Sequence, residues 1–272
     1  MGDFRPGPPQ LRPGRALAHT TGASGSGSPH RSDSRPPQTP RGARPSDPID
    51  CPGTTPPVPG QSTSFLLLGL FGFPALLFAL ITWQVVVDGP LARADERASR
   101  ALVHPDRVSG LLADLGNVQV AVPVLVVALG YAAWRARRIG ADRWWLPATA
   151  AALLMAFLPA LIVPLKELIA RPSTPVMPPS TGYYPSGHTA TATIAYGAAT
   201  LLLLPWLRSA YARRILLGGC AALVLGVSFG LVRSGYHWPL DVVASWCLCG
   251  VLLSSLWLLL GRGTPGPAEE PK

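Results

Sequence analysis

Three short polar segments interrupt a chain that is otherwise apolar over most of its length, and each holds side chains that bind anions or move protons. They are residues 166–172, 183–189 and 233–241, and each lies at the edge of an apolar run. Cationic groups beside imidazoles are typical of sites that hold an anion and transfer a proton. The residues concerned are Lys166, Arg171, Ser186, Gly187, His188, Arg233, His237 and Asp241.

The segment 233–241 pairs a histidine with an aspartate four residues later. Pro239 suits the first position of a helix, which places Asp241 in the first turn and His237 just before it. The carboxylate would accept a hydrogen bond from one ring nitrogen of His237 and leave the other nitrogen free to act as a nucleophile. A structural His–Asp pair at a helix start is the alternative that these residues alone leave open.

Ser186, Gly187 and His188 predict the start of another helix. The unsatisfied backbone N–H groups and the positive dipole end of such a start bind anions. His188 would lie in the first turn, where it could give or take a proton. The alternative is an ordinary helix start with Ser186 as the capping residue.

Lys166 is the only lysine between residues 1 and 271, although arginine serves the other basic positions there. A cation at a helix end often just extends to the headgroups. One lysine and two arginines, Arg171 and Arg233, would together neutralise a phosphate, each arginine as a fork and the lysine as a point charge.

Composition divides the chain into a membrane domain and two tails. Residues 1–62 are crowded with Pro, Gly, Ser, Thr and Arg and predict a disordered tail, as do residues 262–272. Residues 63–261 predict an all-α polytopic membrane protein, because six apolar runs approach the ~20 residues that a spanning helix needs. These runs are about 65–87, 118–134, 146–165, 188–207, 214–232 and 239–260.

Arginine placement predicts the orientation of this six-helix bundle. The short links at 135–145 and 207–214 are rich in arginine, which the positive-inside rule assigns to the cytoplasm. Both termini would then be cytoplasmic in the plasma membrane, and the three polar segments would face the extracytoplasmic side. The 88–117 link would lie on that side too, as an amphipathic interfacial helix.

The net charge of +9 does not predict a nucleic-acid partner. No basic stretch carries interleaved aromatic residues for base stacking. Attraction to anionic lipid headgroups and the topology signal explain the arginines better. The four cysteines form no metal-ligand pattern, and no carboxylate cluster suits magnesium or zinc, so no metal cofactor is expected.

These motifs resemble the type 2 phosphatidic acid phosphatase superfamily over roughly residues 65–260. The family includes lipid phosphate phosphatases and undecaprenyl diphosphate phosphatases and is related to vanadium haloperoxidases. Its pattern is Lys-x6-Arg-Pro, then Pro-Ser-Gly-His, then Ser-Arg-x5-His-x3-Asp. The second motif is complete at 185–188, and the His-x3-Asp half of the third is complete at His237 and Asp241.

The other halves of the pattern depart from the family. The family spacing from Lys166 reaches Ser173-Thr174, whereas Arg171-Pro172 comes two residues early. Counting back from His237, the family's Ser-Arg pair falls on 230–231, occupied by Gly and Leu, and Arg233 stands two residues too close. Loop shortening is expected to return both guanidiniums to the site. The alternative is a phosphate pocket that is built differently.

The resemblance implies a metal-independent phosphohydrolase acting on a lipid phosphate or polyprenyl diphosphate in the membrane. His237 would form a phosphohistidine, oriented by Asp241, and His188 would protonate the leaving oxygen and then activate water. Lys166, Arg171, Arg233, Ser186 and the backbone near Gly187 would bind the phosphate. A phosphotransferase with the same site and a non-catalytic binder of anionic headgroups remain as alternatives; a soluble-type haloperoxidase fits the membrane domain less well.

Overall fold

The structure is a computed structural model that describes residues 61–261, and this part of the chain is helical without strands. An isolated bridge between Pro172 and Thr181 is its only β-type pairing. The predicted all-α class is therefore confirmed for this part. The two predicted disordered tails lie outside the described residues, except that positions 61 and 62 begin the first helix.

Six helices in the described part are long and apolar enough to cross a membrane, as the sequence predicts. The first span, Ser64–Val86, comprises most of α1 (Gln61–Leu67), a π-helical turn and α2 (Phe73–Val86). The others are α5 (Val118–Arg138), α6 (Leu146–Ile169), α7 (Gly187–Leu203) with a short 3₁₀ turn, α8 (Ala210–Arg233) and α9 (Pro239–Gly261).

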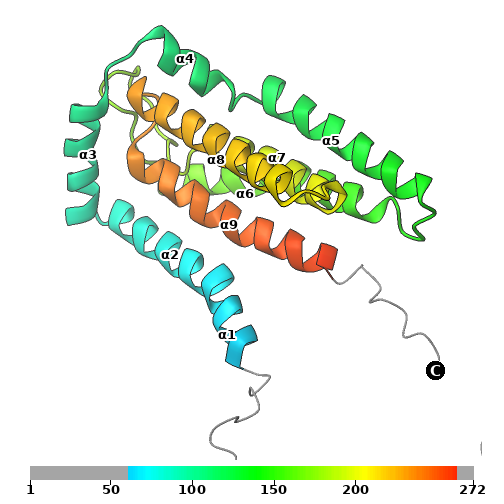
Figure 1. Cartoon of the computed structure of the whole chain (residues 1–272). Helices are drawn as coiled ribbons and strands as arrows, with labels where there is room; N and C mark the ends of the chain where they lie inside the picture. Colours follow the sequence, from blue (N-terminus) through cyan, green and yellow to red (C-terminus); the bar gives the residue numbers. More distant parts are fainter. Residues whose placement is uncertain (1–60, 262–272) are drawn as a thin grey trace, which may run out of the picture. The chain divides into compact units, whose positions relative to one another are not determined.

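Helix α7 is the central helix of this bundle, in contact with α5, α6, α8 and α9 (Figure 1). Its sequence is largely Ala, Thr and Gly, and eleven of its residues are buried. Small side chains let neighbouring backbones approach closely, which is how membrane helices pack without a hydrophobic driving force between them. Packing against four neighbours thus holds α7, which begins with Gly187 and His188, at the centre of the bundle.

The π-helical turn Leu68–Gly72 lies just before a proline in the first span. Pro74 has no N–H to donate to the turn before it, so the helical ladder is interrupted there. The N–H of Phe73 bonds to the carbonyl of Leu68, one residue further back than in an α-helix. The span thus accommodates Pro74 and continues as α2 to Val86.

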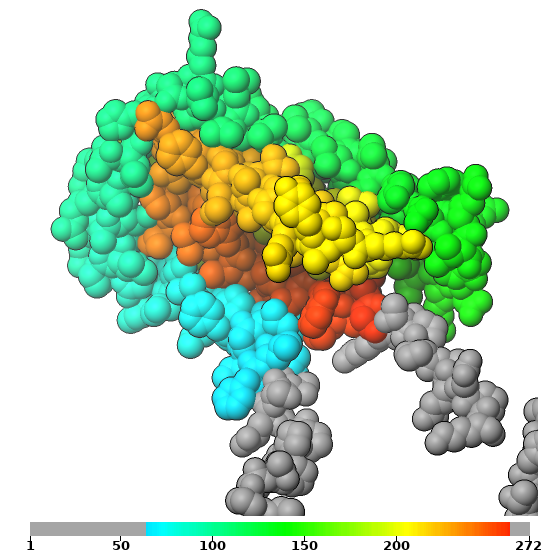
Figure 2. Space-filling view, viewed as in Figure 1, coloured from blue at the N-terminus to red at the C-terminus, as the bar shows by residue number. Residues whose placement is uncertain are grey.

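The link after α2 forms two helices, α3 (Pro90–Leu102) and α4 (Arg107–Asp114), where the sequence predicted one amphipathic helix. Helix α3 buries Ala92, Asp95 and Ser99, which share one face at helical spacing. That face packs on α2, α8 and α9, and α4 packs along α8. Figure 2 shows α3 covering one end of the orange surface formed by α8 and α9.

The direction of the helices places the three polar segments at one end of the bundle. Helices α6 and α8 end there, α7 and α9 begin there, and the 139–145 link lies at the other end. At that other end arginines stack on tryptophans, as Arg135 does on Trp206 and Arg137 on Trp144. The candidate site residues therefore all lie toward the end of the bundle that is opposite the arginine–tryptophan contacts.

Candidate active site

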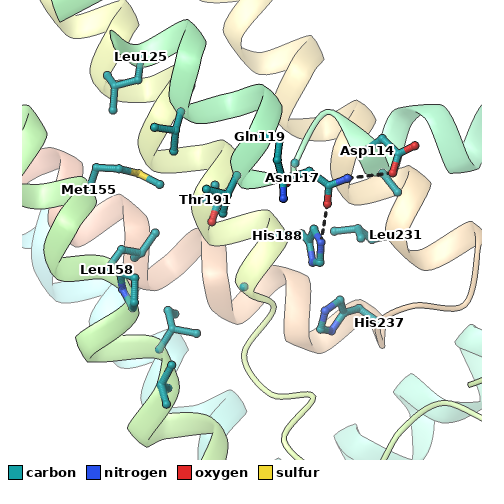
Figure 3. Close-up of a pocket in the computed structure, with 18 of the residues that line it drawn as sticks. Asp114, Asn117, Gln119, Leu125, Met155, Leu158, His188, Thr191, Leu231 and His237 are labelled. Atoms are coloured by element: carbon teal, nitrogen blue, oxygen red, sulfur yellow. Dashed lines mark hydrogen bonds between the residues drawn. The ribbon is translucent and has the colours of Figure 1, made fainter. Parts of the chain in front are cut away.

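A cavity of about 1100 Å³ opens at the end of the bundle that carries the polar segments. Lys166, Gly187, His188 and His237 line it together, although they come from three separate segments. Its other end is apolar and runs between α5 and α6, past Leu125, Met155 and Leu158 (Figure 3). The cavity therefore joins a cationic end to an apolar end.

His237 and Asp241 form the contact that the sequence predicts. The Nδ1 atom of His237 lies 3.3 Å from Oδ2 of Asp241, which also accepts a hydrogen bond from the N–H of Trp238. Because a carboxylate accepts, Nδ1 carries the proton and Nε2 keeps its lone pair. The ring of Tyr183 packs 5.6 Å from the His237 ring, centroid to centroid, and limits its rotation.

Arg171 lies behind this pair and not in the cavity. Its NH1 donates to Oδ1 of Asp241 at 2.6 Å, and its NH2 donates to Oδ2 of Asp95 at 2.8 Å. All three side chains are buried. Burial opposes the charge of Arg171, but the carboxylates of Asp241 and Asp95 more than offset this and raise the pKa of its guanidinium. Arg171 is thus a bridging cation between two carboxylates.

His188 faces His237 across the cavity, with 6.4 Å between ring centroids. Its Nε2 lies 2.9 Å from Oδ1 of Asn117, whose Nδ2 donates to Oδ1 of Asp114 at 3.0 Å (Figure 3). The Asp114 acceptor fixes which way the Asn117 amide points, so Nε2 of His188 must be the protonated nitrogen.

Lys166 and the amino end of α7 supply positive charge to the cavity. The Nζ atom of Lys166 donates to the carbonyl of Gly182 at 2.7 Å, and its stem passes beside Gly187. The first N–H groups of α7 have no acceptor within the helix. Ser186 is fully buried outside the cavity and caps α7 by accepting from Thr189 N, the alternative that the sequence left open.

Arg233 also lies outside the cavity. Its Nε donates to Oδ2 of Asp106 at 2.8 Å, on the exposed surface between α4 and α8. Asp106 caps α4, and the backbone hydrogen bond from Ser109 together with that from Arg233 lowers the pKa of Asp106 to about 2. Neither predicted arginine therefore touches the cavity in this structure.

The structure gives a physical reason for the missing Ser-Arg pair at 230–231. A Cβ atom at Gly230 would lie 2.6 Å from the backbone of both Ala113 and Ser109, so α4 packs directly on the glycine. The Leu231 side chain fills the space between α4, α7 and the cavity and is 1% exposed. Close packing of α4 on α8 thus occupies the place where the family carries its arginine.

No motif in the sequence indicates a role for Asp95, Asp106, Asp114 or Asn117. The available signal was the group of carboxylates in the 88–117 link, which is unusual in so apolar a chain. Among residues 61–261, no group of three or more His, Cys, Asp and Glu side chains is arranged to hold a metal ion.

The model of the PAP2 superfamily matches residues 118–264, which is more than half of the chain and covers α5 to α9. The chain belongs to the PAP2 superfamily. This confirms the resemblance inferred from the motifs at 185–188 and 237–241. The PAP2 match begins at Val118, so α3 and α4 with Asp95 and Asp106 lie before it.

Solved structures similar to this PAP2 protein include the crystal structure of a transmembrane PAP2-type phosphatidylglycerolphosphate phosphatase from Bacillus subtilis. The two chains are 22% identical, and the match covers 70% of this chain and 96% of the other with a TM-score of 0.56. At this identity the likeness shows a shared fold. No curated protein sequence matches this chain.

Proposed function

We propose that the protein is a multi-pass membrane enzyme that hydrolyses the phosphate ester of a membrane lipid. The observation that supports this most is the composition of the cavity described above: two imidazoles, a lysine and a helix amino end at one side, and an apolar groove at the other. Ala152 and Lys166 both line it. The fourteen residue steps from one to the other along α6 correspond to about 21 Å at 1.5 Å per residue. That length is most of the ~30 Å hydrocarbon core of a bilayer.

In the proposed reaction His237 Nε2 attacks phosphorus while the bond from phosphorus to the lipid oxygen breaks. His188 gives its proton to that oxygen, and a phosphohistidine forms. Water then attacks phosphorus, His188 takes up the proton of the water, and the phosphorus–nitrogen bond breaks to release phosphate. Asp241 keeps its hydrogen bond to Nδ1 throughout, which stabilises the positive charge on the ring.

Lys166 and the N–H groups at the start of α7 would neutralise the phosphate oxygens. This part of the proposal differs from the family expectation, because Arg171 and Arg233 are engaged with carboxylates outside the cavity. The substrate class is a lipid phosphate monoester or a polyprenyl diphosphate. The site would face the extracytoplasmic side of the plasma membrane, with the arginine-rich end in the cytoplasm.

The test is phosphate release by the purified protein in detergent with EDTA present. The panel holds phosphatidic acid, phosphatidylglycerol phosphate and undecaprenyl diphosphate. Release that is lost in His237→Ala and kept in His104→Ala, a histidine outside the cavity, would support the nucleophile. Labelled phosphate trapped on the protein under alkaline quench would identify the intermediate. No release from any lipid, or equal release by His237→Ala, would leave a non-catalytic headgroup-binding protein as the better description.

A further inference from the structure

A buried charge network extends behind the nucleophile to a helix that precedes the family match. Arg171 bridges Asp241 and Asp95 through hydrogen bonds of 2.6 and 2.8 Å. Oδ1 of Asp95 also accepts from the N–H of Leu240 at 2.9 Å, so it caps the first turn of α9 next to Asp241. The network thus links α3, the 170–186 loop and α9.

The network is buried and tightly packed. Asp95 is 5% exposed, Arg171 6% and Asp241 0%. The guanidinium of Arg171 also lies over the ring of Trp238, 5.1 Å from its centroid. Trp238 in turn donates its indole N–H to the carbonyl of Pro172 at 3.0 Å, which fixes the ring against the loop that carries Arg171. Such packing leaves the guanidinium little freedom to enter the cavity.

The number of carboxylates paired with Arg171 determines how much negative charge Asp241 presents to His237. With one carboxylate, Arg171 would pair wholly with Asp241 and draw its negative charge away from the imidazole. With two carboxylates, the guanidinium is shared, and Asp241 keeps charge for the His237 ring. Removing one member of a buried set of charges leaves the remaining charges uncompensated. Because solvent does not screen buried charges, the loss of the Asp95 charge affects Asp241 and, through it, the His237 ring.

We propose that Asp95 is a positioning residue for the nucleophile: by sharing Arg171 with Asp241, it keeps Asp241 available to hold His237. This inference rests on the proposed function, in which His237 attacks phosphorus as a neutral imidazole. Asp95 itself does not line the cavity, so it is not placed to touch a substrate there. Its removal therefore acts on kcat and on the pH dependence, and leaves KM nearly unchanged.

Other groups around His237 are the same in wild type and variant, so a change in pH dependence reports on the network. Those that line the cavity with it are the titratable side chains of Lys166, Tyr183, His188, Tyr236 and Asp114.

The test compares Asp95→Asn with wild type by pH profiles of kcat/KM. Without the Asp95 charge, Arg171 pairs wholly with Asp241, and Asp241 stabilises the protonated His237 ring less. The acidic limb of the pH profile therefore moves to lower pH. We expect a shift of roughly half a unit to one unit, less than the one to three units of a charge in direct contact. We also expect kcat to fall roughly tenfold to a hundredfold, as for a misplaced reacting group.

Two controls on α3 separate this role from plain destabilisation. Glu96→Gln neutralises the adjacent carboxylate, which forms no ion pair within residues 64–261, and should leave the profile unchanged. Ala92→Gly loosens the buried face of α3 without changing any charge. It should lower thermal stability and leave the acidic limb in place. A limb that stays in place in Asp95→Asn as well would overturn the proposal and reduce Asp95 to a structural contact.

If Asp95→Asn does not fold, the double variant Asp95→Asn/Arg171→Gln replaces it, because no uncompensated cation is then left. Loss of the nearer positive charge should move the limb to higher pH than in wild type, and an unmoved limb would again overturn the proposal.

Titration of the His237 ring by NMR of histidine-labelled protein gives a readout that needs no substrate. A wild type that releases no phosphate would contradict the proposed function, whereas an unchanged ring titration in the variant would contradict only the role of Asp95.

Discussion

At the scale of single residues, Asn117 orients the ring of His188 by accepting the hydrogen bond from its Nε2. Asn117→Ala removes the acceptor for Nε2 of His188 and leaves the ring free to rotate. We expect kcat to fall by roughly tenfold or more, since positioned proton transfer contributes two to four orders of magnitude. Phosphate release by purified protein measures it. Gln119→Ala, which alters the same cavity wall without a bond to His188, should stay near wild type; an equal loss in both would contradict this role.

Which residue contacts could be predicted from sequence depends on how far apart their partners lie. The His237–Asp241 pair was predictable, because four residues across a helix start bring two side chains together whatever the rest of the fold does. The partners of His188 and Arg171 lie 71 and 76 residues away. These contacts exist only once the start of α5 and helix α3 are packed in place, so neither motif spacing nor periodicity could indicate them.

At the scale of elements, the six spans were predicted because an apolar run is nearly sufficient to specify a membrane helix. The ends were less predictable. Helix α5 runs on to Arg138 and α6 to Ile169, beyond the apolar stretches, because backbone hydrogen bonding continues into the polar interface. Hydropathy marks only the apolar part of such a helix. The 88–117 link was predicted as one helix, and the capping box of Asp106 and Ser109 instead starts a second one.

The packing of α4 on α8 depends on a glycine at the point of contact. Gly230→Ala places a methyl group 2.6 Å from two backbone atoms of α4, and we expect a loss of stability of about 1–3 kcal/mol, the usual cost of overpacking. Gly218→Ala, in the same helix but with open space around it, should keep or slightly raise stability. Thermal unfolding in detergent compares them. Equal midpoints for the two variants would show that α4 yields at this contact.

The ion pair between α4 and α8 should make stability depend on pH in acid. Folding lowers the pKa of Asp106 from 3.8 to about 2, through Ser109 N and Arg233. A group lowered in this way stabilises the fold fully above about pH 4, and the contribution is lost as pH falls through the folded value. Asp106→Asn keeps an N-capping side chain and removes the charge. Its thermal midpoint should lie below wild type near neutrality and converge with it between about pH 4 and pH 2.

Asp142→Asn is the matched control for that comparison, since Asp142 forms no ion pair within the described helices and links. Its offset from wild type should stay constant over the same range. A constant offset for Asp106→Asn would mean that the ion pair with Arg233 adds nothing to stability.

At the scale of the whole molecule, the cavity implies that chain length of the substrate matters. Met155→Trp should fill the groove between α5 and α6, and we expect KM to rise for long-chain phosphatidic acid but not for a short-chain soluble analogue. Phe157→Trp, on the exposed side of α6, provides the control. Equal effects of Met155→Trp on both substrates would contradict the groove as the place of the lipid chain.

The contribution of α9 determines when during synthesis the site becomes complete. This helix is the last of the membrane-length helices in the described part, and it carries Asp241. Its first turns also lock the start of α7, since Ser186 N donates to the carbonyl of Asp241 and Ser245 Oγ to that of Ser186. In the proposed reaction, the five preceding spans therefore hold both histidines but lack the carboxylate that orients the nucleophile. On the proposed mechanism, the newly made chain would become active only after α9 has entered the bilayer, and a chain that stops before α9 should release no phosphate.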